Sequence, residues 1–404
     1  MFLEKYVKEL YRCNRCRQCR YVTEKPLALI DPTTGGPLDH VLTPSCPPGF
    51  LKKFTAYYSS GRLMIAKRIH EGLHKPDEKT AEIFYMCSLC SACDFECSIN
   101  LTSSESPEDL EFRPSKLFEK IREELVNLGI GPMPAHRKFA ESITKNYNPY
   151  LESHSDRMKW AEGRWKTPSK SDVIYFVGCT TAYRHPEIAK ATVDILDKAG
   201  VSYGLLNLNE HCCGSPLLRT GQRKLAEEMM RHNVKAIKEA GAKTVISSCA
   251  GCYATLKKDY PQIFKDLDFQ VLHTSEYLQE LLKEGRLELK EVKRKVTYHD
   301  PCHLGRHAGL YDPPREILKS IPGIQFVEML RQRRHAWCCG GGGGLISGFP
   351  EIASETADIR IQEALSTGAD TLVSTCPFCK LNLVRAADKF KRKIDILDLT
   401  ELIV

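Results

Sequence analysis

The chain of 404 residues lacks any run of 18 consecutive apolar residues, so no stretch is long enough to cross a membrane as a helix. Its first ten residues contain two lysines and two glutamates, whereas a secretory signal needs an unbroken apolar core. We therefore expect a cytoplasmic protein. A basic stripe interleaved with aromatic residues is also missing, so we expect no nucleic-acid binding despite the net charge of +7.

Fingerprints for nucleotide cofactors are absent as well. The glycine run at 340–344 lacks the G-K-[ST] ending of a phosphate-binding loop. Its G-x-G-x-x-G matches carry no information without a strand before them and a helix after them. No pattern for a flavin, a nicotinamide or a quinone is present. The glycine run indicates either a close approach of backbone segments or a flexible loop.

Cysteine, by contrast, is abundant. With 42% hydrophobic and 27% charged residues, the composition is that of a soluble globular protein of two or three domains. Its 18 cysteines are unusual, because a reducing cytoplasm disfavours structural disulfides, and they point to metal or redox chemistry. Eight precede residue 100 and ten follow residue 170, with none in the 81 residues between Cys97 and Cys179. This split predicts two kinds of site.

The first kind of site begins with a C-x2-C-x2-C-x3-C run at 87–97. This spacing is typical of cubane 4Fe-4S clusters, and its fourth cysteine ligates the other cluster of a pair. Zinc fits less well, because it prefers pairs of cysteines separated by a longer loop.

A second run starts at Cys13 but has Thr23 where its fourth cysteine should be. The next cysteine is Cys46, followed by Pro47, after an inserted segment that contains PTTGG at 32–36. We interpret Cys46 as the displaced fourth ligand. The crossed rule then predicts two cubane clusters, one held by Cys13, Cys16, Cys19 and Cys97, the other by Cys87, Cys90, Cys93 and Cys46. A single cubane at 87–97 beside a degenerate run is the alternative, and Ser98 stands where a proline is expected.

Helical spacing of apolar residues at 60–73 and 114–130 predicts a helical domain over 1–145. The polar segment at 103–109 is expected to be a solvated connector. A stretch rich in Pro, Trp and polar residues at 146–171 indicates a linker or a long surface loop. Trp160 and Trp165 in it are expected to pack at the domain junction, or to be covered by a partner subunit.

The second kind of site is a repeat of five cysteines in matching order. The first set is Cys179, Cys212, Cys213, Cys249 and Cys252, and the second is Cys302, Cys338, Cys339, Cys376 and Cys379. Short β-branched runs end at a cysteine at 173–179, 244–249, 295–302 and 370–376, and helical patterns with a terminal glycine occupy 185–200, 222–241 and 350–369. This alternation predicts two α/β units, at 172–290 and 291–404, with parallel strands whose carboxyl ends bring the cysteines to one edge.

Adjacent cysteines require a particular explanation, because a disulfide between neighbours forms a strained ring. Five thiolates also exceed the four corners of a cubane. A cluster in which some thiolates bridge two irons would use all five, and Gly214 and Gly340 would let backbone approach it closely.

Several phrases resemble the CCG-domain iron–sulfur proteins, the family of the D-type subunit of heterodisulfide reductase: YHDPCHLGR (298–306), SCAGCYATLKKDYP (248–261), WCCGGGGG (337–344) and TCPFCKLNL (375–383). The resemblance implies an α/β chain in which an N-terminal α-helical bis-cluster ferredoxin domain precedes two repeated α/β CCG domains with short parallel sheets. It further implies that each five-cysteine set holds a non-cubane 4Fe-4S cluster, and that a disulfide is cleaved between the two clusters. The insertion before Cys46 departs from the family pattern.

The resemblance implies partners too: other redox subunits in a hetero-oligomeric complex, supplying electrons from a flavin, a haem or a ferredoxin, with possible docking at a membrane through a partner. A thiol or disulfide would be the substrate. A similar architecture serves in the iron–sulfur subunits of anaerobic glycerol-3-phosphate dehydrogenase and of the tungsten-type benzoyl-CoA reductase complex. A non-catalytic electron relay therefore stays open as an alternative, and so does a zinc-stabilised scaffold without redox work.

Further polar side chains lie beside the cysteines in sequence: His211, Trp337, His299, His303, Arg306 and His307. Histidines could supply protons to departing thiolates. We favour the simpler interpretation that these side chains donate hydrogen bonds to cluster sulfurs or cap helices. The RQRRH segment at 331–335 could recognise an anionic substrate, but we expect a solvated basic loop that offsets cluster charge.

Overall fold

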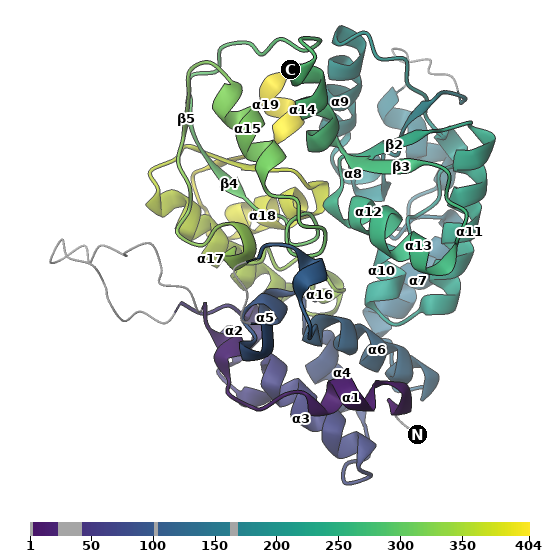
Figure 1. Cartoon of the computed structure of the whole chain (residues 1–404), viewed down its shortest axis with the longest axis vertical. Coiled ribbons are helices and arrows are strands. Elements are labelled where there is room, and N and C mark those ends of the chain that lie inside the picture. Colours follow the sequence, from purple (N-terminus) through teal and green to yellow (C-terminus); the bar gives the residue numbers. More distant parts are fainter. Residues whose placement is uncertain (1–2, 23–42, 101–103, 162–168) are drawn as a thin grey trace, which may run out of the picture.

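The computed structural model describes residues 3–22, 43–100, 104–161 and 169–404. Figure 1 shows a helical N-terminal part below two sheet-containing parts that lie side by side. Thr23, most of the inserted segment and Trp165 lie outside the described residues. Within the described residues, no helix is both long and apolar enough to span a membrane.

The N-terminal part is helical, as the apolar spacing predicts. Its α-helices are Val7–Tyr11 (α1), Pro47–Lys52 (α2), Ser59–His70 (α3), Glu78–Tyr85 (α4), Ala92–Phe95 (α5) and Pro114–Asn127 (α6). The next helix, Pro134–Asn146 (α7), lies beside the first repeat, and its Phe139 and Ile143 pack in the core of the repeats. Short 3-10 turns lie at Glu4–Tyr6, Gln18–Arg20, Thr55–Tyr57, Ser98–Asn100 and Pro107–Asp109. Apolar faces of α3, α4 and α6 form its core, including Leu63, Phe84 and Phe118.

The first repeat contains a parallel sheet of order β1-β2-β3. Its strands are Val173–Tyr175 (β1), Thr244–Ser247 (β2) and Gln270–His273 (β3), with Val173 opposite Thr244 and Thr244 opposite Gln270. Its α-helices are Cys179–Arg184 (α8), Pro186–Lys198 (α9), Ser215–Arg219 (α10), Arg223–Glu239 (α11), Ala250–Ala254 (α12), Tyr260–Ile263 (α13) and Thr274–Lys283 (α14). A π-helical turn covers Thr255–Asp259, and 3-10 turns cover His154–Ala161 and Asn207–Asn209.

The second repeat contains a parallel sheet of order β5-β4-β6-β7. Its strands are Arg294–His299 (β4), Ile324–Phe326 (β5), Thr371–Ser374 (β6) and Asp395–Asp398 (β7). Its α-helices are Asp312–Ser320 (α15), Leu345–Gly348 (α16), Pro350–Ser366 (α17), Pro377–Phe390 (α18) and Leu399–Ile403 (α19), with a 3-10 turn at Arg333–His335. The four strands expected to end at cysteines are β1, β2, β4 and β6, and all of them are parallel.

Glycines end the long helices of the repeats at the predicted places. Helices α9, α11 and α17 are each followed by a glycine with positive φ: Gly200 at 64°, Gly241 at 74° and Gly368 at 70°. This left-handed conformation costs glycine little, so the chain can turn sharply out of each helix into the next strand.

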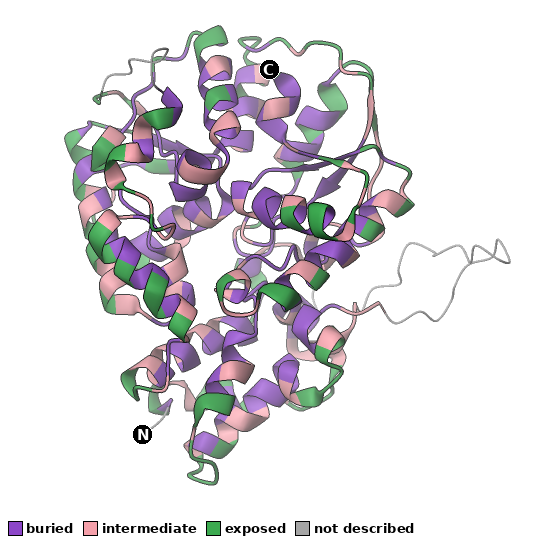
Figure 2. Cartoon of the chain, turned by 180° about the vertical axis from the view of Figure 1, so that it is seen from behind, coloured by how far each residue is buried: buried purple, intermediate pink, exposed green. Residues whose placement is uncertain are grey.

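The two repeats share their cores and pack directly on each other. Helix α9 lies against α19, and α14 lies against α15. One buried cluster contains Tyr175 of the first sheet together with Val296 and Tyr298 of the second. Figure 2 shows buried segments concentrated in the sheets and where the parts meet, with exposed residues on the outer helices. The two strand edges therefore hold a defined position relative to each other.

Arg122 on α6 fastens the N-terminal part to both repeats. Its guanidinium is fully buried and donates hydrogen bonds to carbonyl oxygens of Cys87, Arg219 in the first repeat and Gly343 in the second. One side chain therefore joins three separate parts of the chain at the loop that carries the 87–97 cysteines.

Two sequence expectations about connecting segments need correction. Residues 104–109 are only partly a solvated connector: Glu108 and Asp109 are exposed, but Pro107 is buried and Glu105 pairs with Arg333. Residues 146–161 are not a surface loop, because Arg157 is buried against the first repeat. Trp160 is buried in a core cluster that contains residues of both repeats, in agreement with the expectation that it packs at a domain junction. Composition suggested exposure in both cases, while the burying partners lie far away in sequence.

Candidate metal centres

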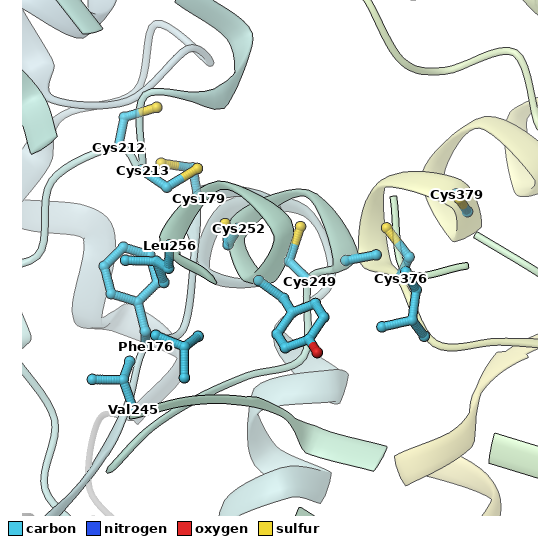
Figure 3. Close-up of a cluster of buried hydrophobic side chains, with 14 of the residues drawn as sticks. Phe176, Cys179, Cys212, Cys213, Val245, Cys249, Cys252, Leu256, Cys376 and Cys379 are labelled. Carbon is cyan, nitrogen blue, oxygen red and sulfur yellow. The ribbon is translucent and has the colours of Figure 1, made fainter. Parts of the chain in front are cut away.

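The first five-cysteine set gathers at the carboxyl edge of the first sheet. Cys179 follows β1 and opens α8, while Cys249 follows β2 and precedes α12, which carries Cys252. Cys212 and Cys213 come from the loop before α10. All five are buried, and Figure 3 shows them in neighbouring positions at the ends of these elements. The structure brings this set together as the strand pattern predicts.

The second set repeats this arrangement at the second sheet. Cys302 follows β4, and Cys376 follows β6 and precedes α18, which carries Cys379. Cys338 and Cys339 lie in the loop before α16. The Sγ atoms of Cys339 and Cys379 are 3.3 Å apart, and all five cysteines are buried.

The two sets face one cavity between the repeats, with a volume of about 380 Å³. Its cysteine lining comes from both sets: Cys179, Cys212, Cys213, Cys249, Cys252, Cys302, Cys339, Cys376 and Cys379. A hydrogen bond from the Cys249 thiol lowers the pKa of Cys376 well below its ordinary value. Figure 3 shows these two side chains with their sulfur atoms pointing the same way. A single small molecule in the cavity could therefore reach sulfur atoms of both repeats.

The eight N-terminal cysteines form two groups. A small cavity is lined by Cys46, Cys87, Cys90 and Cys93, which are the four residues of the second predicted cluster. The other group contains Cys97, which lies near Cys13 and Cys16. Burial and the charges of these two thiols raise the pKa of Cys97. Although Cys46 and Cys87 are far apart in sequence, the fold places them in one wall.

The 87–97 loop also contacts the second repeat. The Cys90 and Cys338 thiols are hydrogen-bonded to each other, and this contact together with burial raises the pKa of Cys90. Ala92 and Cys302 pack in the same small buried cluster. The group around Cys46 is therefore adjacent to the second five-cysteine set.

Arg157 places a buried positive charge on the first set. Its Nη1 lies 3.6 Å from the Sγ of Cys179, and its Nη2 pairs with the carboxylate of Glu210. Glu210 also accepts hydrogen bonds from the backbone NH groups of Val177 and Gly178, at 2.9 and 2.8 Å. Hydrogen bonds from Cys212 and the charge of Arg157 outweigh burial and lower the pKa of Cys179.

The histidines beside the cysteines are held as neutral groups. Burial lowers the pKa of His299 and of His211 to about 3, and that of His303 to about 4. His303 Nδ1 lies 3.6 Å from the Sγ of Cys302, and His211 is stacked between Tyr147 and a second histidine. An uncharged imidazole can donate one hydrogen bond to sulfur, which is the interpretation favoured from the sequence.

His299 also lies where it could bind a metal ion together with two cysteines, which its position beside Cys302 in the sequence did not suggest. One of its ring nitrogens and the sulfurs of Cys339 and Cys379 all lie within 4.8 Å of one another, in a buried position. Imidazole nitrogen and thiolate sulfur are both ligands for iron and zinc.

Arg306 and His307 are hydrogen-bonded to the backbone of the 87–97 loop. Arg306 Nε donates to the carbonyl oxygen of Cys90 at 2.6 Å, and a ring nitrogen of His307 lies 2.9 Å from the carbonyl oxygen of Leu89. Trp337 Nε1 donates to the carbonyl oxygen of Thr356. These three side chains therefore bond to backbone oxygens, where the sequence interpretation expected cluster sulfurs or helix caps.

The prediction of a solvated basic loop at 331–335 is wrong. Arg331 and Arg334 are buried, and Arg331 pairs with Glu363 at 3.2 Å. Arg333 pairs with Glu105 and Asp312. This basic segment can be buried because acidic residues of other elements pair with its arginines on folding. Those partners cannot be recognised from the sequence.

The glycine run at 340–344 is a close backbone approach and not a free loop. A Cβ on Gly343, whose φ is 63°, would come within 2.8 Å of the Cys87 carbonyl oxygen. The backbone NH groups of Gly340 and Gly341 donate to the sulfurs of Cys338 and Cys339, at 3.3 and 3.5 Å. Glycine therefore permits contact with the 87–97 loop on one side, while its NH groups point at thiols on the other.

Two arginines of the site were missed from the sequence. Arg157 lies 22 residues before Cys179 in a polar stretch, with no motif around it. Arg385 on α18 lines the cavity, is exposed, and has no ion-pair or hydrogen-bond partner among the residues that the structure describes. A cation without a partner at a cavity wall suits an anionic ligand.

The donor sets fit iron–sulfur clusters. None of the 18 cysteines, all of which are described, is in a disulfide, so every thiol can serve as a ligand. Backbone NH groups point at the sulfurs of Cys87, Cys338 and Cys339, as expected where thiolates carry negative charge. Each group of five buried sulfurs exceeds the four ligands that a structural zinc site needs.

Comparison with known proteins decides the family. A 4Fe-4S dicluster domain model matches residues 9–101, and a cysteine-rich CCG domain model matches residues 173–257 and 296–384. The chain is 41% identical, over 78% of its length, to the D-type subunit of the dihydromethanophenazine:CoB–CoM heterodisulfide reductase of Methanosarcina mazei, and the match covers 76% of that protein. The chain belongs to this family of heterodisulfide reductase subunits. It is therefore an iron–sulfur oxidoreductase subunit of the heterodisulfide reductase type.

More distant likenesses extend beyond this family. The chain is 36% identical to the B-type subunit of the fumarate reductase (CoM/CoB) of Methanothermobacter marburgensis, over 76% of its own length and 58% of that protein. A crystal structure of a hypothetical protein from Helicobacter pylori matches with a TM-score of 0.54 at 14% identity, over 85% of this chain and 66% of that one. The latter shows a shared fold alone. The chain combines a dicluster domain and two CCG domains, as the sequence predicts.

Proposed function

We propose that this chain passes electrons between two cubane 4Fe-4S clusters and a two-cluster CCG site, where a disulfide is reduced to two thiols or two thiols are oxidised. The observation that carries the proposal is the cavity of about 380 Å³ lined by both five-cysteine sets. The net reaction consumes two electrons and two protons for each disulfide and releases two thiols. The opposite direction releases the same electrons and protons.

The cysteines divide among four clusters in this proposal. Cys13, Cys16, Cys19 and Cys97 would hold one cubane, and Cys46, Cys87, Cys90 and Cys93 the other. The first non-cubane cluster would take Cys179, Cys212, Cys213, Cys249 and Cys252, and the second Cys302, Cys338, Cys339, Cys376 and Cys379. When bound, such clusters accept and release single electrons. The contact between Cys90 and Cys338 supports a route from the cubanes into the second repeat.

The protein's own groups define the reaction site around this chemistry. Phe139, Phe378 and Ile346 make part of the cavity wall apolar, which restricts water. Arg385 would bind an anionic group of the substrate, and the relative's name identifies the CoB–CoM heterodisulfide as a first compound to test. Electrons would come from partner subunits, as in the multi-subunit enzymes to which the relatives belong by name.

The test is an anaerobic assay with reduced viologen and a panel of disulfides, including the CoB–CoM heterodisulfide, a CoA disulfide and uncharged disulfides. We expect turnover with at least one anionic disulfide. Arg385→Ala should raise KM for it about tenfold with little effect on kcat. Lys393→Ala, which removes an exposed cation that does not line the cavity, is the matched control.

Electron paramagnetic resonance separates catalysis from relay. In oxidised protein titrated with coenzyme M, coenzyme B or coenzyme A, a signal that appears only with one thiol would place substrate sulfur at the CCG site. An intact preparation that turns over no disulfide, and whose signals follow potential but ignore every thiol, would show a relay subunit instead.

A further inference from the structure

The two C-x2-C-x2-C loops of the N-terminal part share one backbone conformation. Arg15 and Arg17 follow Cys13 by two and four residues, as Leu89 and Ser91 follow Cys87. All four residues lie in the left-handed region, with φ of 61° and 66° in the first loop and 53° and 59° in the second. The middle cysteines, Cys16 and Cys90, are therefore equivalent positions.

In the second loop, this face is an internal interface. Leu89 and Ser91 are fully buried, and Cys90 is nearly so. A ring nitrogen of His307 lies 2.9 Å from the Leu89 carbonyl oxygen and 3.1 Å from Ser91 Oγ, and the Cys90 thiol reaches Cys338. The middle cysteine and its two left-handed neighbours are thus the face by which this loop contacts the next redox site.

In the first loop, the same face is open and positively charged. Cys16 is the only exposed one of the 18 cysteines. Arg15 and Arg17 are exposed on either side of it, and neither has an ion-pair partner among the residues that the structure describes. Residues 3–22 contain six arginines and lysines against two glutamates, and Arg12 is paired with Glu111.

We propose that Arg15, Cys16 and Arg17 form the docking face for an acidic electron-carrying protein. The internal equivalent shows that this backbone face can bring a middle cysteine against another group of cysteines. The guanidinium groups of Arg15 and Arg17, which have no ion-pair partner within the described part of the chain, would be complemented by carboxylates on the partner. The inference rests on the proposed electron-transfer function. One electron would leave the reduced partner, which is thereby oxidised, and would reduce the cubane cluster that Cys13, Cys16, Cys19 and Cys97 would hold, with no atom transferred.

The test uses a reduced plant-type [2Fe–2S] ferredoxin as an acidic probe with the full, iron-loaded chain. Two quantities are measured under anaerobic conditions: Kd for oxidised ferredoxin by calorimetry, and the rate at which reduced ferredoxin bleaches the cluster absorbance in stopped flow. For Arg15→Glu/Arg17→Glu we expect at least a tenfold rise in Kd and a similar fall in the rate at low salt, because steering by opposite charges operates there. Wild type should lose this advantage as salt is raised.

The controls separate docking from damage. Lys283→Glu/Lys393→Glu removes two exposed cations on the CCG domains and should leave both quantities within twofold, while Arg15→Lys/Arg17→Lys should keep most of the affinity. Reduced viologen, a small cation, should reduce all variants as fast as wild type. Equal losses in both double-glutamate variants, or unchanged ferredoxin binding in Arg15→Glu/Arg17→Glu, would overturn the docking face. Failure of the disulfide assay would leave these readouts standing, because neither depends on a substrate.

Discussion

At the scale of single residues, the buried pair of Arg157 and Glu210 places a positive charge beside the Cys179 thiol. Both side chains are 2% exposed. The carboxylate is held by two backbone NH groups as well, so it stays charged and fixes the guanidinium beside Cys179. The guanidinium charge, 3.6 Å from the Cys179 sulfur, favours the more negative charge state of any group that the Cys179 thiolate binds.

Arg157→Met is therefore expected to destabilise the protein by about 3 kcal/mol, since it leaves the Glu210 carboxylate buried without its partner. Combining it with Glu210→Gln should recover part of this loss. Urea denaturation under anaerobic conditions measures both. Lys243→Met, which breaks the exposed pair with Asp172, should change stability by less than about 1 kcal/mol. A loss for Arg157→Met no larger than that of the control would contradict the prediction.

Asp398 provides a pH dependence at the same scale. It is buried at the N-cap of α19, and burial together with the charge of Glu401 raises its pKa to about 7, despite hydrogen bonds from Thr400. Its Oδ2 has no hydrogen-bond partner among the described residues. Because the folded pKa exceeds the unfolded value of about 3.9, the unfolded chain releases the proton first, and stability falls as pH rises from about 4 to about 7.

The shift corresponds to about 4 kcal/mol between these limits. Asp398→Asn keeps the capping oxygen and removes the titration, so the variant should gain on wild type as pH rises from 5.5 to 7.5. Urea midpoints of the two proteins at three pH values in this range measure the effect. A constant difference between them at all three values would show that Asp398 does not titrate there.

At the scale of elements, loops and helix ends position the cysteines while strands carry them to one edge. The glycine run at 340–344 packs closely against the 87–97 loop, so the second five-cysteine set and the N-terminal cysteines are in contact there. Gly343 and Gly200 have nearly the same φ, 63° and 64°. A Cβ at Gly343 would nevertheless have backbone atoms within 3 Å, whereas a Cβ at Gly200 would meet no atom of the described residues within 4 Å.

Gly343→Ala should consequently cost several times more than Gly200→Ala, which carries only the left-handed strain of about 1 kcal/mol. We also expect Gly343→Ala to slow electron transfer from the N-terminal clusters to the CCG site, because Cys87 and Ser88 would have to move. Urea denaturation and single-turnover reduction kinetics compare the two variants. Equal stability and equal reduction rates of the two variants would mean that the 87–97 loop can move to accommodate the added Cβ and would contradict the prediction.

At the scale of the whole molecule, the assignment of Cys46 depends on chain segments that only the fold brings together. Iron content tests it directly. Intact protein should hold about sixteen irons, four in each of four clusters. Cys46→Ala should lower this to about twelve with loss of one cubane signal, whereas Ser45→Ala, at the neighbouring buried position, should keep the full content. A Cys46→Ala protein with unchanged iron and unchanged spectra would show that Cys46 is not a ligand. About twelve irons in the intact protein would instead show that the 13–19 run is a relic without its own cluster.

Much of the architecture followed from local pattern. The repeated cysteine order, the β-branched runs that end at cysteines and the terminal glycines such as Gly200 and Gly241 depend on near neighbours in the chain, so the sequence by itself determined the α/β repeats and the sulfur-rich edges. The expectations for the 331–335 segment and for residues 146–161 failed for the opposite reason. Arg333 and Arg157 look solvated in sequence, because Glu105 and Glu210, which neutralise them, lie 228 and 53 residues away.

Only the tertiary structure decided how the four groups of cysteines are ordered in space. Sequence spacing could not show that Cys90 contacts Cys338, that Cys249 contacts Cys376, or that Cys16 is the most exposed of the 18 cysteines. Each of these facts depends on how the N-terminal part and the two repeats pack, which is set by long-range contacts such as those of Arg122. Local chemistry therefore determined which residues are candidate cluster ligands, and packing determined which groups of cysteines lie next to one another.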